Sequence, residues 1–146
     1  MILNDAGKMI EKWCEELSHK FSDIEIDAYI IMPNHFHVII VNTGNDGDVG
    51  ADLRVCPNNN NDISDTEISG EHIGSPLHVV VQWFKTMTTN EYIRGVKALG
   101  WQPFDKKLWQ RNYWEHIIRN EKSYQHITNY IINNPENWQN DKFYLD

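Results

Sequence analysis

Two histidines separated by one residue stand in an apolar stretch of the chain, YIIMPNHFHVII at residues 29–40. In a β-strand alternate side chains point to the same face, so His35 and His37 share one face and Phe36 points to the other. Two imidazoles on one face are close enough to bind one metal ion. The pair alone is a weak signal, because chance pairs and histidines packed in a core explain most such patterns.

A third ligand and a nucleophile are available near the end of the chain. Tyr130 and Asn134 are four residues apart in a segment with helical periodicity, so they lie on one face of one turn. An asparagine oxygen beside two histidine nitrogens suits a hard divalent ion, and the sequence predicts Mg2+ or Mn2+ as the cofactor. A phenol one turn away can attack a phosphate held there, because a nearby cation favours the phenolate. The alternative is an ordinary surface tyrosine on an amphipathic helix.

The spacing of apolar residues predicts the elements that must position these side chains. Ile10, Cys14 and Leu17 recur at helical spacing, whereas Pro33-Asn34 marks a turn that divides the histidine stretch into a hairpin. A proline at 135 excludes helix for the residue before it and ends the last helix. The predicted elements are a helix over 5–20, strands over 24–32 and 35–42, a helix over 76–98, a strand over 108–118 and a helix over 121–134.

Residues 43–75 differ from the rest of the chain in composition. Asn, Asp, Gly and Ser dominate there, and four consecutive asparagines stand at 58–61. Such a segment has too little apolar surface to fold on its own. We therefore expect one domain over residues 1–146, with 43–75 as a long disordered insertion loop.

The composition is that of a folded soluble protein, with 40% apolar and 12% aromatic residues. No apolar run is long enough to span a membrane, and nothing resembles a signal peptide. Cys14 and Cys56 are far apart, which argues against a disulfide framework or a cysteine zinc site. These features predict a cytoplasmic protein that does not associate with a membrane.

The basic residues are concentrated in one segment of an acidic chain. The net charge is −8, yet residues 83–122 hold eight Lys or Arg against four Asp or Glu. Tryptophans and tyrosines are interleaved with these cations, which is the composition of a surface that binds a nucleic acid strand. A solvated face of mixed charge over a core would look similar and is the commoner case.

Two motifs in order resemble the single-tyrosine HUH transposases, which include the REP-associated tyrosine transposases. IDAYIIMPNHFHVII resembles their His-hydrophobic-His motif, and LWQRNYWEHIIRNEKSYQHITNYIINNPENW resembles their second conserved block. The resemblance spans nearly the whole chain except residues 43–74. It implies that Tyr130 attacks single-stranded or hairpin DNA to form a 5′-phosphotyrosine link. It also implies a metal ion held by His35, His37 and Asn134 that orients the scissile phosphate.

The resemblance also implies partners and a fold. Some family members are homodimers, and the expected fold is α+β, with a ferredoxin-like antiparallel sheet, helices on one face and a C-terminal helix carrying the tyrosine. Here Met1 stands almost directly before the first helix, so the first strand of that sheet is expected to be lacking. Candidates for contact with the DNA backbone are Lys85, Arg94, Lys97, Lys106, Lys107, Arg111 and Arg119.

Three functions compete for this sequence. The first is a DNA strand transferase that uses Tyr130 as its nucleophile. The second is a DNA-binding remnant without catalysis, which the lacking strand suggests. The third is a small metal-binding or interaction domain unrelated to DNA, which the acidic charge and the seven histidines suggest. We rank them in this order.

Overall fold

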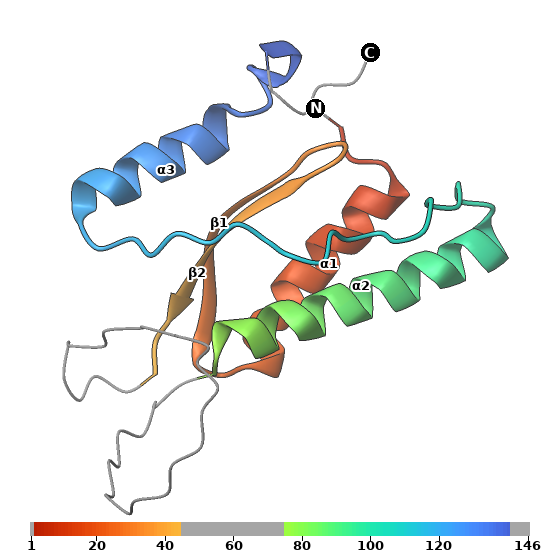
Figure 1. Ribbon diagram of the computed structural model, residues 1–146, viewed down its shortest axis with the longest axis horizontal. Helices are drawn as coiled ribbons and strands as arrows, with labels where there is room; N and C mark the ends of the chain where they lie inside the picture. The colour runs from red at the N-terminus through yellow and green to blue at the C-terminus, as the bar shows by residue number, and fades with distance from the viewer. Residues whose placement is uncertain (1, 45–74, 141–146) are drawn as a thin grey trace, which may run out of the picture.

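The computed structural model describes residues 2–44 and 75–140, and every structural statement below refers to these residues. The elements are α1 (Asp5–Lys20), β1 (Ile24–Ile31), β2 (Phe36–Asn42), α2 (Leu77–Leu99), α3 (Glu121–Asn133) and a short 3-10 turn, Trp138–Asn140. This confirms the α+β prediction: a two-stranded antiparallel sheet and three helices form an arrangement compatible with half of a ferredoxin-like fold. In Figure 1 the hairpin lies between α3 on one side and α1 with α2 on the other.

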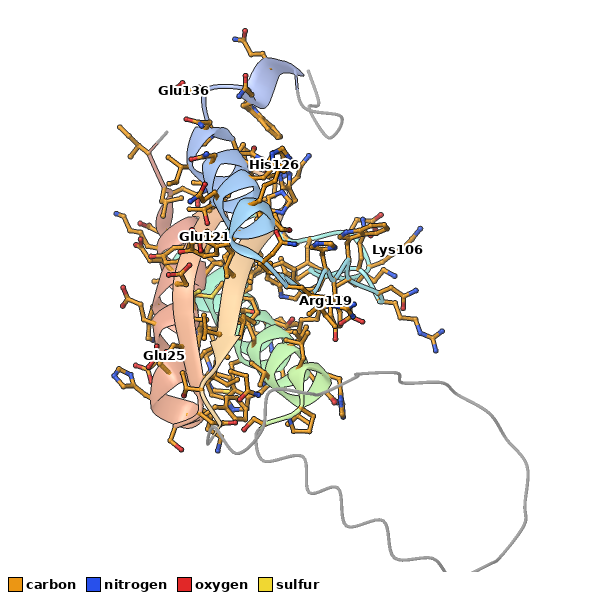
Figure 2. All side chains as sticks on the ribbon, turned by 90° about the vertical axis from the view of Figure 1, so that its left-hand side faces the viewer. Glu25, Lys106, Arg119, Glu121, His126 and Glu136 are labelled. Carbon is orange, nitrogen blue, oxygen red and sulfur yellow. The ribbon has the colours of Figure 1, made fainter. Side chains whose placement is uncertain are left out.

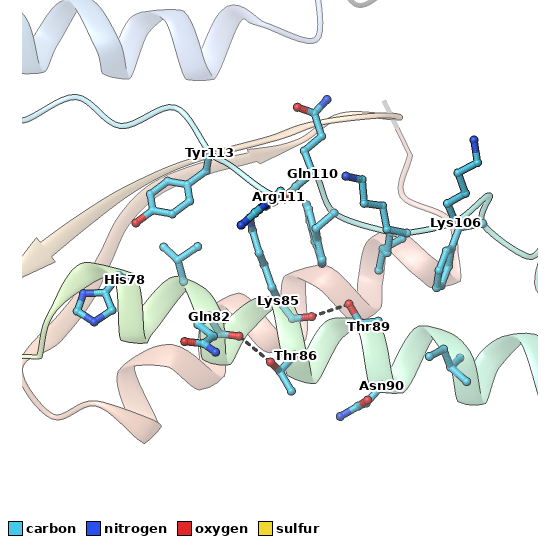
Figure 3. Close-up of a pocket in the computed structure, with 16 residues that line it drawn as sticks. His78, Gln82, Lys85, Thr86, Thr89, Asn90, Lys106, Gln110, Arg111 and Tyr113 are labelled. Carbon is cyan, nitrogen blue, oxygen red and sulfur yellow. Dashed lines mark hydrogen bonds between the residues drawn. The ribbon is translucent and has the colours of Figure 1, made fainter. Parts of the chain in front are cut away.

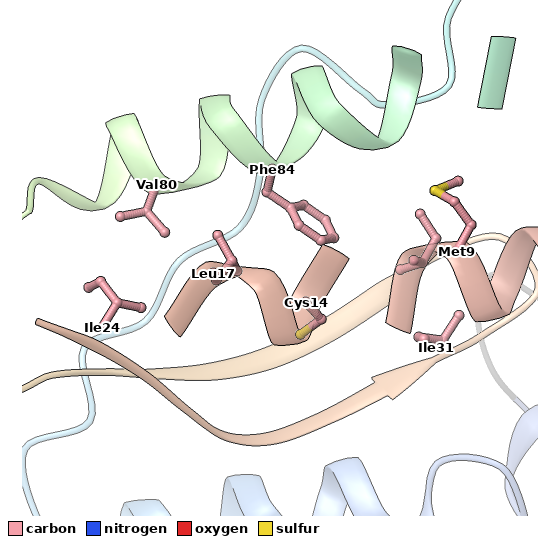
Figure 4. Packing of buried hydrophobic residues seen from close by; sticks show 8 residues of the cluster. Met9, Cys14, Leu17, Ile24, Ile31, Val80 and Phe84 are labelled. Atoms are coloured by element: carbon pink, nitrogen blue, oxygen red, sulfur yellow. The ribbon is translucent and has the colours of Figure 1, made fainter. Parts of the chain in front are cut away.

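Helix α1 supplies the largest part of the core. The side chain of Asn4 caps its start by accepting a hydrogen bond of 2.8 Å from the backbone of Gly7. Its buried face carries Met9, Cys14 and Leu17, at the spacing that turns successive residues toward the same side. These side chains pack against Ile24 and Ile31 of β1 and against α2, as Figure 4 shows.

A β-bulge at Asp27 sets which side chains face that core. In the hairpin Ile26 pairs with Ile40 and Ala28 pairs with Ile39, so Asp27 has no opposite residue. An extra residue reverses the alternation of the strand beyond it. Before the bulge the even-numbered residues Ile24 and Ile26 face the core. After it the odd-numbered residues Tyr29 and Ile31 do so. His37, which pairs with Ile30, therefore lies on the opposite face.

Helix α2 packs on α1 and reaches the sheet through one aromatic contact. Val80, Phe84 and Thr88 form its buried stripe at four-residue spacing. The Phe84 ring stacks on Phe36 of β2, with ring centroids 5.4 Å apart. The hydroxyl of Thr88 donates to the carbonyl of Phe84 at 2.7 Å, so this polar group is buried without loss of a hydrogen bond.

The end of α2 is fixed by glycine. Gly100 ends the helix with φ of 72°, the left-handed conformation that glycine adopts without strain. The ring of Trp101 then folds back over Gly95, where a Cβ atom would collide with it. The chain therefore reverses closely and runs back along α2.

The segment 108–118 is not a strand, and that prediction is wrong. A strand is stable only beside another strand, because its backbone groups must be paired. The sheet of the described residues contains β1 and β2 alone. Most of the segment is exposed, including Trp114 at 94%. Its alternating sequence therefore produces an extended connection from α2 to α3 (Figure 1).

The two ends of the long insertion are held at one place. The hydroxyl of Ser75 donates to Asp23 at 2.8 Å, and its backbone also donates to that carboxylate. These bonds lower the pKa of Asp23. On the other side Thr43 donates its backbone N–H to the carbonyl of Asp23 at 2.7 Å. The chain thus leaves and re-enters the domain beside Asp23, while most of the predicted loop, 45–74, lies outside the described residues.

No helix in the described part of the chain is long and apolar enough to cross a membrane.

We expect the Cys14 thiol to be unreactive in the folded protein. Its side chain is fully buried, and burial, together with Glu15 and Glu11, raises its pKa from 9.0 to about 12. In a Cys56→Ser variant, an aromatic disulfide reagent at pH 8 should label Cys14 only as fast as the protein unfolds. Rapid labelling without denaturant would contradict this packing.

The same pKa shift has a consequence for stability. Between about pH 9 and about 12 the unfolded chain loses the Cys14 proton while the folded chain keeps it. The free energy of unfolding should therefore fall with rising pH in this window and be unaffected by Cys14 below it. A Cys14→Ala variant should show a shallower alkaline decline in urea titrations.

Candidate functional site

His35 and His37 stand at the closed end of the hairpin. The backbone N–H of Met32 donates to the carbonyl of His35 at 2.9 Å and closes the turn at Pro33-Asn34. The two imidazole rings have centroids 5.0 Å apart, which confirms that they share a face. Nδ1 of His35 also lies 2.9 Å from Oδ1 of Asn34, so the neighbouring asparagine helps to orient this ring.

Helix α3 brings Tyr130 to this pair of histidines. The rings of His37 and Tyr130 meet edge to face, with centroids 5.3 Å apart. Tyr130 nevertheless keeps 50% of its surface exposed. A tyrosine in this position contacts the histidine site and can still be reached from solution.

Helix α3 begins at a capped residue and docks on the outer face of the hairpin through one hydrogen bond and one buried side chain. Asn120 caps the helix by accepting a hydrogen bond of 2.8 Å from the backbone of Ser123. The Tyr124 hydroxyl donates to Asp27, the bulge residue, at 2.8 Å. This bond to a carboxylate raises the pKa of Tyr124. On the same helix Ile131 is buried, with only 3% of its surface exposed.

The chain just beyond α3 also reaches the histidine pair, through Trp138. The Trp138 ring lies 5.9 Å from the His35 ring, whereas Tyr130 contacts His37. Asn134, the residue that caps the end of α3, stands in the sequence midway between Tyr130 and Trp138. Its side chain is 3% exposed, and its Oδ1 accepts no hydrogen bond from the described residues.

These donors fit a divalent metal ion. A buried amide oxygen without a hydrogen-bond donor is costly unless a ligand satisfies it. Asn134 supplies such an oxygen, and together with the two imidazoles it would form a mixed donor set with room for substrate oxygens. Within the described residues no group of three His, Cys, Asp or Glu could hold a metal ion. A metal ion bound to these two histidines would need a third ligand of another type, such as an asparagine oxygen.

The predicted DNA-contacting cations separate into two sets. Lys85, Lys106, Lys107 and Arg111 line one groove between α2 and the segment that follows it. The remaining cations, Arg94, Lys97 and Arg119, lie outside its lining. Figure 2 shows Lys106 and Arg119 on one side of the molecule and Glu25 of β1 on the other.

The two tryptophans considered for base stacking differ in environment. Trp109 is packed: its ring is 5.7 Å from Phe84, and its Nε1 donates to Thr88 at 2.8 Å. Trp114 is 94% exposed. Trp114 is therefore available to a ligand, whereas Trp109 has a structural role.

Sequence reasoning did not identify Asp27 and Tyr124 as the contact that orients α3. Their hydrogen bond joins residues 97 positions apart, and no local pattern indicates it. The contact of Trp138 with His35 carried no helical signal either, because Trp138 stands beyond Pro135 and outside α3.

Removing the Tyr124 hydroxyl should loosen α3 selectively. In Tyr124→Phe the ring is kept and the hydrogen bond to Asp27 is lost, so amide hydrogen exchange should accelerate in α3 and not in α1. Tyr92→Phe is the matched control, because its hydroxyl donates to the carbonyl of Gln102 instead, at 2.9 Å. Equal exchange in α3 for both variants would show that the bond to Asp27 does not hold the helix.

Comparison with known proteins gives one long match and one short match. Over its whole length the chain is 34% identical to an uncharacterized protein of Haemophilus influenzae, of which it covers 73%. Over 30 residues it is 53% identical to a REP-associated tyrosine transposase of Escherichia coli K12. That match covers 20% of this chain and 18% of the transposase. No family model matches the chain. No solved structure gives a significant match.

Proposed function

We propose that this chain, which belongs to the same family as the uncharacterized Haemophilus influenzae protein, cleaves and rejoins single-stranded DNA through Tyr130. The observation that carries the proposal is the contact between the Tyr130 and His37 rings, at 5.3 Å, beside a second histidine. It brings a nucleophile and metal-ligating side chains together from segments about a hundred residues apart. The short match to a tyrosine transposase supports the same chemistry.

The reaction exchanges one ester for another. The Tyr130 oxygen attacks the phosphorus of a DNA phosphodiester, the bond from phosphorus to the 3′-oxygen breaks, and a 5′-phosphotyrosine forms. The phenol proton passes to solvent, which reaches the half-exposed ring, and the departing oxygen takes up a proton to become a 3′-hydroxyl. Attack by a 3′-hydroxyl on the phosphotyrosine reverses these steps and joins the strands. No nucleotide cofactor is needed, because the ester bond is conserved.

The protein's own groups orient the reactants. His35, His37 and Asn134 would hold Mg2+ or Mn2+, and such an ion, when bound, supplies charge that polarises the scissile phosphate. The hairpin fixes the two histidines, while the docking of α3 sets the position of Tyr130 relative to them. Asn34 restrains the His35 ring through its hydrogen bond at 2.9 Å.

Replacing Tyr130 by Phe should abolish covalent attachment to DNA. Wild-type protein, incubated with Mn2+ and labelled single strands from the DNA flanking its gene, should give an adduct that survives denaturing electrophoresis. Tyr130→Phe should reduce its yield by at least a hundredfold, on the order expected for the loss of a nucleophile. Tyr92→Phe, which alters a tyrosine on the other side of the sheet, should keep the full yield.

Two results would overturn the proposal. Equal adduct yield in wild type and Tyr130→Phe would remove Tyr130 from the reaction. Binding of hairpin DNA without any cleavage, even with Mg2+ or Mn2+ added, would favour the DNA-binding protein without catalysis.

The role of Asn134 can be tested apart from activity. Without metal, Asn134→Leu should keep or raise the melting temperature, because it removes a buried oxygen that lacks a donor. Added Mn2+ should raise the melting temperature of the wild type and raise that of Asn134→Leu much less. An equal Mn2+ effect on both proteins would exclude Asn134 as a ligand.

A further inference from the structure

A groove of about 800 Å3 lies between α2 and the segment 104–113 that runs back along it (Figure 3). One wall is the face of α2 that includes Gln82, Lys85 and Thr89. The other wall includes Lys106, Lys107 and Arg111. The lining of the groove does not include His35, His37, Tyr130 or Asn134, so the groove is separate from the histidine and tyrosine site.

The charge of this groove is opposite to that of the whole protein. Its lining contains four Lys or Arg and no Asp or Glu, in a chain of net charge −8. Ion pairs in the described part of the chain involve Lys8, Lys12 and His19, none of which lines the groove. The cationic lining is therefore available to an anionic ligand.

Lys85 has a structural role in shaping the groove. It donates to the backbone carbonyl of Gln110 at 2.9 Å and lies 5.3 Å from the centre of the Tyr113 ring. Partial burial lowers the pKa of this lysine. Lys85 thus links the two walls of the groove. The exposed cations of the lining are Lys106, Lys107 and Arg111.

Aromatic side chains accompany these cations. Phe104 and Tyr113 line the groove beside the packed Trp109, and the exposed Trp114 follows at its end. A row of cations with interleaved aromatic rings is the arrangement that binds single strands, because phosphates pair with the cations while unstacked bases lie on the rings. A duplex keeps its bases stacked and cannot use the rings in this way.

We propose that this groove binds single-stranded DNA outside the cleavage site and holds the strand whose phosphate Tyr130 attacks. This inference rests on the proposed function for its substrate. The chain itself gives the direction: the segment leaves the groove at Tyr113, passes Trp114 and Arg119, and enters α3, the helix that carries Tyr130. From Glu121 to Tyr130 the helix rises about 14 Å, a span of a few nucleotides.

The test compares two matched pairs of substitutions in a Tyr130→Phe background, which prevents covalent attachment. Lys106→Gln with Lys107→Gln removes two groove charges, and Lys8→Gln with Lys20→Gln removes two charges from α1. All four lysines are exposed, so neither pair disturbs the core. The probe is fluorescent oligothymidylate of roughly 20 nucleotides, longer than the typical site of a single-strand binding domain, and fluorescence anisotropy is recorded over a range of salt concentrations.

We expect the groove pair to weaken binding by about tenfold or more at low salt. It should also reduce the slope of log affinity against log salt by roughly 1.4, since each phosphate contact on a single strand contributes about 0.7. The α1 pair should leave both quantities nearly unchanged. Equal effects of the two pairs, or no effect of either, would overturn the proposal. Stronger competition by a duplex of equal length than by a single strand would also overturn it.

The two assays together distinguish failure of DNA binding by the groove from failure of DNA cleavage by Tyr130. If Tyr130 is not the nucleophile, adduct formation fails in the wild-type protein while the groove pair still weakens binding. If the groove is not a DNA site, the wild-type adduct forms, and the groove pair made with Tyr130 intact gives the same adduct yield as the wild type at every DNA concentration.

Discussion

The docking of α3 on the outer face of the hairpin is the constraint on which the candidate site depends. A helix of 13 residues is marginal in water by itself, so its position must come from tertiary contacts. Burial of Ile131 contributes roughly 1.5–3 kcal/mol. The hydrogen bond from Tyr124 to Asp27 is exposed, so it orients α3 on the hairpin more than it stabilises the docking. Without this docking Tyr130 and Asn134 would lose their contact with the hairpin.

The bulge at Asp27 serves both faces of the sheet. It reverses the alternation of β1, so that Tyr29 and Ile31 face the core formed with α1 and α2. It also leaves Asp27 unpaired in the ladder, where its carboxylate can accept the Tyr124 hydrogen bond. One irregular residue therefore adjusts the core and fixes the helix on the opposite face.

Local features could be predicted from the sequence, and long-range features could not. The Pro33-Asn34 hairpin and the helices follow from turn residues and apolar spacing, and both appear within a residue or two of the predicted bounds. The strand predicted over 108–118 fails because pairing requires a neighbour, which alternation within one segment cannot show. The common face of His35 and His37 could be predicted from strand geometry. The bulge and the bond from Tyr124 to Asp27 join distant residues, so no local pattern gives them.

The absence of a strand at 108–118 also explains how the groove arises. In a paired strand, alternate residues of this segment would be buried against a helix layer, and its backbone would be used by the ladder. Here Arg111, Tyr113 and Trp114 remain exposed, while Lys85 holds the segment to α2 through the Gln110 carbonyl. The extended connection thus presents cations and aromatic rings along the route from α2 to α3. Glu25 of β1 lies on the opposite side of the molecule from Lys106 (Figure 2), and the groove lining holds no Asp or Glu that would repel an approaching polyanion.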